Sequence, residues 1–326
     1  MDVRRKAMQL MIAIVMATFG SCTRSGNGPV APPDSNTDFE GDLTQFNEAC
    51  RDSIVFSSYR FAGINMMYND GTGLHGILTP WDWPISITWS PKKWKIFFIV
   101  DTAQDFHGRG LFMMKWSGGD LRRLTPMNEN VWAAACAPDG QKIVYTVLGD
   151  SSKGKLRVSD PSGAYAHDIT GFVLWNQSNK LSWSPDSKRV VFDGFPIVTS
   201  KGKFDGLGVA NADGTFAGPL FVPDHNCYMP DWSTVNGKIL YASFVLVDTV
   251  YYLNIFYLDP VTQLSHQITS LRGTAEYPHW SQDGSRVVFN FKQVGESRSH
   301  IYVMNLDGSG LTQLTSGDYS DSNPAW

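Results

Sequence analysis

The chain has 326 residues, a formal net charge of −4 and no run of lysine or arginine in the body of the sequence. A surface that binds nucleic acid needs concentrated positive charge, so this charge pattern argues against DNA or RNA as a partner. The length by itself allows either one large domain or two domains of ordinary size.

Residues 1–21 have the pattern of a secretory signal peptide. Three basic residues, Arg4 to Lys6, precede an apolar run from Met8 to Phe19, and two small residues follow. The run is shorter than the roughly 20 apolar residues that cross a bilayer as a helix, so a cleaved signal is favoured over a transmembrane anchor. The stretch FGSC resembles a bacterial lipobox, which implies lipidation of Cys22, with cleavage by ordinary signal peptidase as the alternative.

Residues 22–49 are predicted to form a flexible tether, because they hold few apolar residues and many of Pro, Gly, Ser and Asn. Such a tether keeps a folded body at some distance from the membrane that carries the lipid. The expected location is therefore the bacterial cell envelope, where the lipid-anchored protein faces the periplasm or the cell surface.

Residues 50–326 repeat one template. The copies are aligned on anchor positions that recur about every 47 residues, at Trp89, Cys136, Trp183, Trp232, Trp280 and Trp326. A period of this length indicates a repeat architecture. Because the copies fill the segment, they leave no room for a second globular domain.

Each copy is predicted to be a four-stranded antiparallel meander. After Trp280 a QDG turn leads into the strand SRVVFNF, and the strand HIYVMN leads through the turn at Asp307 and Gly308 into LTQLT. Asp-Gly is a hairpin signal, and the segments between the turns are rich in β-branched and aromatic residues. One such sheet cannot bury both of its faces, so the copies are expected to stack around a ring as the blades of a β-propeller.

The two ends of the segment complement each other. Residues 52–79 supply only the later strands of a unit, whereas the C-terminal SNPAW supplies an inner strand with no unit after it. The predicted fold class is therefore all-β, a six-bladed β-propeller closed by pairing the C-terminal strand with the N-terminal strands.

The repeat resembles a known family. The pattern P-x-W-S-P-D-G-x-x-[IV]-x-F, followed by I-Y-V-M-N-x-D-G and L-T, is similar to the WD40-like (PD40) repeat of the TolB-like propellers, and LSWSPDSKRVVFDG is a close match. The resemblance covers residues 50–326. It implies an envelope propeller whose channel mouth binds a protein, with a Pal-like lipoprotein as one candidate partner. TolB proteins carry an additional N-terminal α/β domain where this chain has its tether, so the resemblance does not imply a Tol-specific role.

Two repeated residue types have a structural interpretation. The anchor tryptophans recur at one strand position and are predicted to pack between blades. Asp139, Asp186 and Asp283 recur in the polar turns, and turn formation accounts for them.

The candidate functional residues precede the predicted inner strands. In a propeller these segments converge on one mouth of the central channel, and their aromatic and acidic side chains are typical of a recognition surface. An ordinary solvated loop surface is the alternative interpretation. The predicted partner-binding residues are Trp81, Trp83, Glu129, Trp175, His225, Tyr228, Glu276, Tyr277, His279, Tyr319 and Asp321.

The favoured function is a non-enzymatic, monomeric envelope lipoprotein whose propeller is a scaffold for other envelope proteins. The sequence contains no paired metal-binding histidines and no G-x-S-x-G motif. The alternative is a carbohydrate-binding or oligosaccharide-lyase-like propeller, since TolB-like repeats also occur in such lyases. No cofactor is expected, and a structural Ca²⁺ site built from acids such as Glu276 and Asp321 is compatible with either function.

Overall fold

The computed structural model describes residues 52–58, 60, 63–77, 84–90, 95–101, 108–149, 154–170, 180–221 and 225–326. The expectations for the signal, Cys22 and the tether lie outside these residues. The described residues form strands and turns and contain no helix. Accordingly, none of them belongs to a helix long and apolar enough to cross a membrane.

The described strands form four four-stranded sheets and one eight-stranded sheet. In chain order the strands are β1 (Ser53–Ser58), β2 (Gly63–Tyr68), β3 (His75–Gly76), β4 (Ser86–Ser90), β5 (Lys95–Asp101), β6 (Arg109–Lys115), β7 (Arg122–Arg123), β8 (Asn130–Cys136), β9 (Ile143–Leu148), β10 (Gly154–Ser159), β11 (His167–Asp168), β12 (Leu181–Trp183), β13 (Arg189–Thr199), β14 (Gly202–Asn211), β15 (Ala217–Phe221), β16 (Tyr228–Trp232), β17 (Ile239–Val247), β18 (Val250–Asp259), β19 (Leu264–Gln267), β20 (Gly273–Trp280), β21 (Arg286–Gln293), β22 (His300–Asn305), β23 (Thr312–Gln313) and β24 (Asp321–Ala325).

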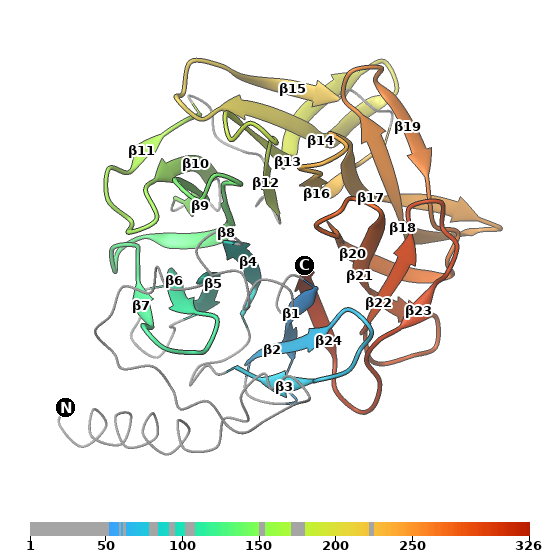
Figure 1. Cartoon of the computed structure of the whole chain (residues 1–326). Coiled ribbons are helices and arrows are strands. Elements are labelled where there is room, and N and C mark those ends of the chain that lie inside the picture. The colour runs from blue at the N-terminus through green and yellow to red at the C-terminus, as the bar shows by residue number, and fades with distance from the viewer. Residues whose placement is uncertain are drawn as a thin grey trace, which may run out of the picture. The chain divides into compact units, whose positions relative to one another are not determined.

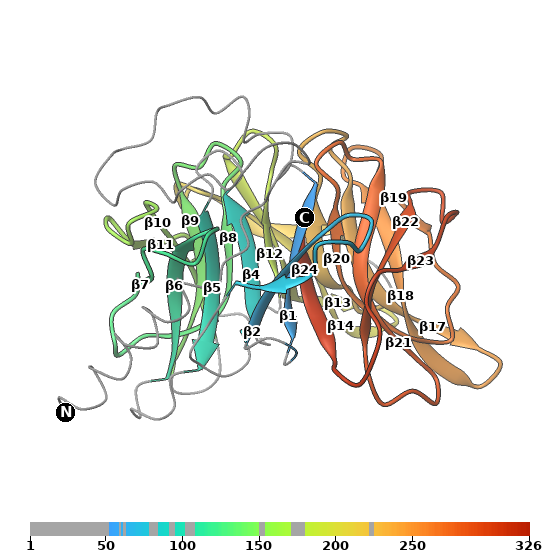
Figure 2. The same ribbon diagram turned by 60° about the horizontal axis from the view of Figure 1, so that its bottom comes forward.

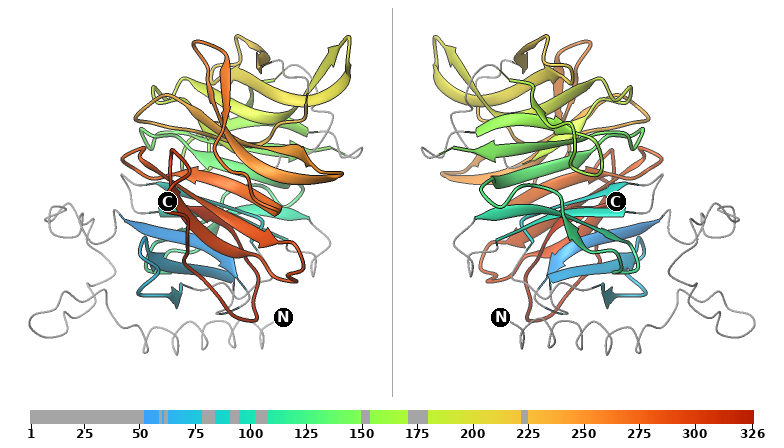
Figure 3. Two further views of the ribbon diagram at one scale, coloured as in Figure 1. Left: turned by 90° about the vertical axis from the view of Figure 1, so that its right-hand side faces the viewer. Right: turned by 90° about the vertical axis from the view of Figure 1, so that its left-hand side faces the viewer.

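The sheets stand around a common centre (Figure 1). Strands β4, β8, β12, β16, β20 and β24 lie nearest that centre, and we call them the inner strands. Seen from the side, the sheets stand next to one another with their strands running between two ends of the body (Figures 2 and 3). This arrangement brings the six inner strands together although they come from positions far apart in the sequence.

The sheet that contains the first described strand also contains the last. Strand β1 pairs antiparallel with β24, with Val55 opposite Ala325 and Ser58 opposite Asp321. The other side of β1 pairs with β2. The C-terminal strand, which has no unit after it in the sequence, therefore completes a sheet begun by β1, β2 and β3.

The eight-stranded sheet consists of two meanders joined by one parallel contact. Strands β16 to β19 form the first meander and β20 to β23 the second. The contact between them pairs Leu253 of β18 with Thr274 of β20.

The core lies between neighbouring sheets and between the two meanders of the eight-stranded sheet. One cluster joins Ala133 of β8 to Trp183 and Phe192 of the next sheet, and another joins Leu240 of β17 to Trp280 of β20. Both faces of the central strands are therefore buried, which explains why β1 and β2 are buried at almost every position rather than at alternate ones.

The anchor tryptophans are all buried, which confirms the interpretation that they pack inside the fold. Three of them also donate their indole N–H to the preceding inner strand: Trp89 to Ala325 O at 3.2 Å, Trp183 to Ala135 O at 3.0 Å and Trp280 to Asp231 O at 3.0 Å. The tryptophan thus fills the space between two sheets and satisfies a backbone carbonyl across it.

The turn aspartates also have the expected structural role. Asp139 Oδ1 accepts the backbone N–H of Gln141, and Asp283 Oδ1 accepts that of Ser285. These bonds within the turn lower the pKa of Asp283, with a side-chain hydrogen bond from Ser281 as the main cause.

The indole bonds make a prediction about stability. Trp183→Phe removes the hydrogen bond to Ala135 O, whereas Trp326→Phe removes none, because Trp326 Nε1 is buried without a partner among the residues described above. Both changes delete the same atoms, so we expect Trp183→Phe to lower the free energy of unfolding by about 1 kcal/mol more than Trp326→Phe. Urea denaturation of both variants measures the difference, and equal losses would contradict the role given to the indole bond.

Candidate functional site

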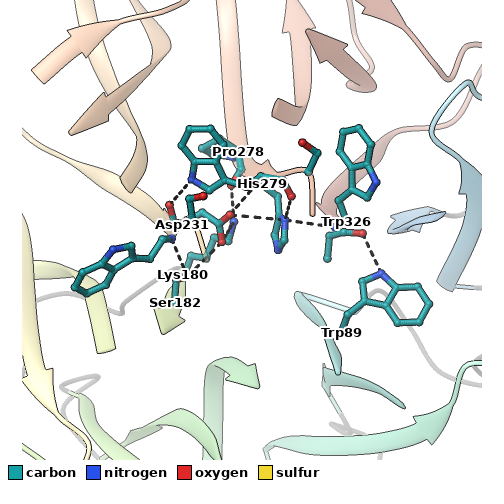
Figure 4. A network of polar contacts seen from close by, with 12 residues as sticks. Trp89, Lys180, Ser182, Asp231, Pro278, His279 and Trp326 are labelled. Atoms are coloured by element: carbon teal, nitrogen blue, oxygen red, sulfur yellow. Dashed lines mark hydrogen bonds and ion pairs between the residues drawn. The ribbon is translucent and has the colours of Figure 1, made fainter. Parts of the chain in front are cut away.

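Asp231 of β16 is the centre of a buried polar network (Figure 4). Its Oδ2 accepts a hydrogen bond from Trp280 N at 2.9 Å. Its Oδ1 lies 3.4 Å from Ser182 Oγ and 3.4 Å from Lys180 Nζ. Lys180, which directly precedes β12, also donates to the carbonyl oxygen of Pro278. The network therefore connects three inner strands, β12, β16 and β20.

The residue before each anchor tryptophan tends to contact the next inner strand. Ser182 Oγ accepts a hydrogen bond from Trp232 N at 2.9 Å, as Asp231 does from β20. His279 occupies the same place, and its Nδ1 lies 3.4 Å from Trp326 N and 2.9 Å from the carbonyl oxygen of the following residue. The shorter contact favours a proton on Nδ1.

Burial controls the protonation of this network. Desolvation lowers the pKa of Lys180, although the adjacent Asp231 carboxylate opposes the effect. Desolvation also lowers the pKa of His279, again opposed by Asp231, whose Oδ2 lies 3.7 Å from Nδ1. Because these groups contact one another and the backbone, the arrangement is suited to holding inner strands together.

The inner strands carry a recurring irregularity two to three residues before the tryptophan. The pairing register shifts between Val131 and Ala134 in β8, between Tyr228 and Asp231 in β16, and between Glu276 and His279 in β20. Non-glycine residues with positive φ lie at this point in three strands: Met229 (57°), Tyr277 (52°) and Asn323 (52°). Such a conformation is unfavourable for most side chains and persists where surrounding contacts enforce it.

The backbone N–H of each of these residues has a specific acceptor. Met229 N donates to Asp193 Oδ2 at 2.9 Å, and Asn323 N donates to Asn290 Oδ1 at 3.3 Å. Asp193 and Asn290 occupy the same place in the repeat, at the end of VVFD and VVFN, and both are buried. Tyr277 N instead contacts Met229 Sδ at 3.3 Å.

A cavity of about 210 Å³ lies where the inner strands begin. It is lined by residues from four sheets: Ile85, Trp132, Glu276, Tyr277, Asn290, Ser299, Ser322 and Asn323. A hollow of about 320 Å³ lies elsewhere, beside the outer turns at Asp70 and Asn305, and none of the predicted site residues lines it.

Two acceptor groups in the lining of the 210 Å³ cavity, on Glu276 and Asn323, are incompletely satisfied. Glu276 Oε2 receives a hydrogen bond from Asn290 Nδ2 at 3.3 Å, and the other end of the Asn290 amide binds the backbone of Asn323. Burial raises the pKa of Glu276, while the bond from Asn290 and the charge of Lys292 act in the opposite direction. Burial, reinforced by the Glu276 charge, raises the pKa of Tyr277. Asn323 Oδ1 is buried and has no hydrogen-bond partner in the part of the chain that the structure describes.

The structure brings two of the predicted partner-binding residues, Glu276 and Tyr277, to this cavity. His279 belongs instead to the Asp231 network. Tyr228 packs edge-on against Phe244 of β17, with ring centroids 6.1 Å apart.

His225 stacks near Tyr241 and Phe256, with centroids 6.4 and 6.2 Å away. Trp81, Trp83 and Trp175 lie outside the described residues.

Glu129 and Asp321 take part in ion pairs with the chain itself. Glu129 Oε1 pairs with Arg157 Nη1, and Arg157 Nε also binds Asp168 at 2.8 Å. Asp321 is fully buried, with Oδ2 3.6 Å from Arg60 Nη2 and 3.5 Å from His300 Nδ1. These contacts place neither acid on the wall of the cavity.

Tyr319 is exposed, and the guanidinium of Arg60 lies 5.6 Å from its ring centroid. The role of all these residues in binding a partner stays a prediction.

Sequence reasoning did not single out Lys180, Asp231, Asn290 or Trp132. A usable signal existed for Asp231, because it replaces the small residue that precedes the anchor position in most other copies. The polar residue that ends VVFD and VVFN in otherwise apolar strands was a second signal. No sequence pattern identifies Trp132 or Lys180, and only the three-dimensional arrangement shows their positions in the cavity and the network.

Among the described ranges, no group of three His, Cys, Asp or Glu side chains lies close enough to hold a metal ion. Glu276 and Asp321, the acids named for a Ca²⁺ site, have the separate surroundings given above. The calcium site stays an untested expectation.

No protein-family model matches the chain. Similar solved structures include TolB from Acinetobacter baumannii, with a TM-score of 0.69, 18% identity and coverage of 84% of this chain and 66% of that chain. A putative TolB from Agrobacterium tumefaciens has a TM-score of 0.60 at 17% identity, covering 83% and 96%. An oligogalacturonate lyase in complex with manganese has a TM-score of 0.51 at 15% identity, covering 82% and 80%.

These similarities establish the fold. The chain is a β-propeller of the TolB-like kind, as the repeat pattern predicted. It spans 66% of the length of the Acinetobacter protein, and identities below 20% carry no information about activity or partners.

The Asp231 network makes a second prediction. Lys180→Met leaves the buried Asp231 carboxylate without its cation, so we expect a loss of about 3 kcal/mol in the free energy of unfolding. Adding Asp231→Asn removes the unpaired charge and should recover part of that loss. Urea denaturation of the two single variants and the double variant tests this, with the exposed Lys188→Met as control. Additive effects of the two changes would contradict the pairing.

His279 makes the protein's stability depend on pH. Its folded-state pKa lies below the ordinary value of 6.5, so the unfolded chain binds a proton first as the pH falls. Stability from this group is therefore present above pH 6.5 and is lost below it. We expect the difference in unfolding free energy between wild type and His279→Gln to shrink between pH 7.5 and pH 5, measured by denaturant titration at each pH; a constant difference would exclude this role for His279.

Proposed function

We propose that the propeller has six blades and that the pairing of β1 with β24 closes it. Two observations support this proposal. The eight-stranded sheet divides at its single parallel contact into two meanders, which with the other sheets makes six four-stranded groups. The group β24–β1–β2–β3 takes its innermost strand from the C-terminus and the rest from the N-terminal end of the body. Closure of this kind joins the two ends of the body through backbone hydrogen bonds.

We further propose that the chain is a non-enzymatic scaffold that binds a protein partner at the end where the inner strands begin. The observation that carries this proposal is the division of the central polar groups into two sets. Lys180, Asp231 and His279 contact one another and the backbone. By contrast, Glu276 and Asn323 line a cavity and retain unused acceptor capacity.

The size of the cavity supports binding over catalysis. At about 210 Å³ it is smaller than the roughly 300–1,000 Å³ of typical small-molecule sites. A general base or nucleophile must reach the substrate, whereas the lysine and histidine with lowered pKa belong to the interstrand network. Glu276, the acid in the cavity, has no histidine, lysine or serine among its hydrogen-bond partners in the described part of the chain.

The proposed setting is the bacterial envelope, with a lipid on Cys22 that anchors the propeller to a membrane. This part of the proposal rests on the sequence of residues 1–22 and on the resemblance of the repeats to TolB. The partner is an envelope protein, and a Pal-like lipoprotein is one candidate.

A carbohydrate ligand is the second candidate, and one observation favours it. The cavity combines the aromatic residues Trp132 and Tyr277 with the acid Glu276, a composition that suits stacking and hydrogen bonding to a sugar. The similarity to an oligogalacturonate lyase concerns the fold. Binding of oligosaccharides to the purified protein, without capture of a protein in cells, would favour this candidate.

The scaffold proposal predicts the outcome of cross-linking in cells. The tagged full-length protein should capture a defined protein, and a variant with Tyr228→Ala and Glu276→Ala should lose it, because both residues lie at the proposed binding end. Tyr165→Ala is the control, since this exposed aromatic lies in a turn between outer strands β10 and β11. Mass spectrometry identifies the captured protein. No capture by wild type, or equal capture by wild type and the double variant, would refute the proposal.

A further inference from the structure

Two acceptor groups in the lining of the 210 Å³ cavity have unused capacity. Asn323 is 8% exposed, lines the cavity, and has an Oδ1 atom with no hydrogen-bond partner among the described residues. Glu276 contributes a carboxylate that receives a neutral hydrogen bond from Asn290. A buried acceptor without a donor costs free energy, so a ligand that supplies donors gains from entering this cavity.

We propose that the cavity receives one lysine or arginine side chain of the partner polypeptide, whose flanking apolar residues cover the neighbouring β17–β18 hairpin. This inference rests on the proposed function and specifies the chemistry of the partner.

Charge complementarity selects a basic side chain. An ammonium or guanidinium group is a donor without an acceptor, which matches a wall made of the Glu276 carboxylate and Asn323 Oδ1. Lys292, the cation of this chain that acts on Glu276, is itself exposed, so solvent weakens its competition for the carboxylate.

The size and the walls of the cavity agree with this occupant. A volume of about 210 Å³ suits one side chain better than a drug-sized ligand. Trp132, one of the lining residues, already has the guanidinium of Arg109 3.7 Å from its ring centroid. Aromatic walls stabilise cations through the negative potential of their ring faces, so this chemistry is compatible with the site.

The β17–β18 hairpin supplies an apolar surface beside the cavity. Beyond Ala242, which pairs with Tyr228, β17 continues to Val247 past the start of β16. Phe244 and Leu246 lie on one face of this extension together with Tyr251, which is directly opposite Leu246. Their exposed fractions are 48%, 55% and 65%. With Tyr228, which packs against Phe244, these residues form what we call the hairpin face.

The hairpin face lies next to the strand that carries Glu276. Leu253, opposite Phe244 and on the same face, pairs with Thr274 of β20, two residues before Glu276. An ion pair of 3.0 Å between Asp248 at the hairpin tip and Arg272 makes a second link to this strand. A short extended segment can therefore contact the cavity and the hairpin face together.

Parallel selections test the inference. A random-peptide library displayed on phage is panned against the full-length wild-type protein and against Glu276→Gln. We expect wild type to enrich peptides with Lys or Arg beside apolar residues. A synthetic peptide of the enriched sequence should bind at least about tenfold more weakly after its basic residue is changed to Gln, because a hydrogen bond to a charged group is lost.

Matched variants assign the effect to the cavity. Glu276→Gln should weaken the same peptide about as much, whereas Glu296→Gln, an equal change of charge at an exposed turn, should leave its affinity unchanged. The double variant Phe244→Ala, Leu246→Ala should also bind the peptide more weakly, because it loses apolar contacts on the hairpin face. Glu276→Asp keeps the charge and provides a second reference if Glu276→Gln fails to fold.

Three results would overturn the inference: no enrichment on wild type, enriched peptides without a basic residue, or equal affinity for wild type and Glu276→Gln. The cross-linking experiment separates this failure from failure of the scaffold proposal. If a partner is captured at this end and its capture does not depend on Glu276, the scaffold function is supported. The inference that a basic side chain enters the cavity is then contradicted. Absence of any captured protein would remove the scaffold function itself.

Discussion

The fold depends on polar contacts that cross from one inner strand to the next. Edge strands at the centre of a ring present backbone groups that their own sheet does not satisfy. Here Ser182 and Asp231 accept backbone N–H groups from the following inner strand, and three anchor tryptophans donate to carbonyl groups of the preceding one. These contacts fix the distance between neighbouring sheets, and the position of every residue near the centre follows from them.

Local sequence patterns predict some parts of the structure, and contacts between distant residues determine the others. The strands, their turns and the burial of the tryptophans follow from local patterns, because each unit repeats the same turn residues and the same apolar strands. The surroundings of Glu129 could not be predicted this way, since Arg157 comes from β10 of the same sheet and no local pattern identifies it as a partner. Asp321 was placed at the mouth by its distance from Trp326, yet Arg60 and His300 hold it in the interior.

The recurring irregularity of the inner strands also limited the prediction of the site. An alternating strand would send Glu276 and Tyr277 to opposite faces by simple parity. The positive φ of Tyr277 and the register shift next to it break that parity, so Glu276 and Tyr277 reach the cavity while His279 turns to Asp231. Aspartate and asparagine in the sequences VVFD and VVFN hold neighbouring irregularities in place, which assigns these two polar residues a structural role.

The single parallel contact between β18 and β20 has a mechanical consequence. It makes the hairpin and one wall of the cavity parts of the same hydrogen-bonded sheet. A displacement of the hairpin tip is therefore transmitted to the strand that carries Glu276 through the backbone, which is stiffer than side-chain packing. A partner that contacts the β17–β18 hairpin can in this way change the position of Glu276 in the cavity.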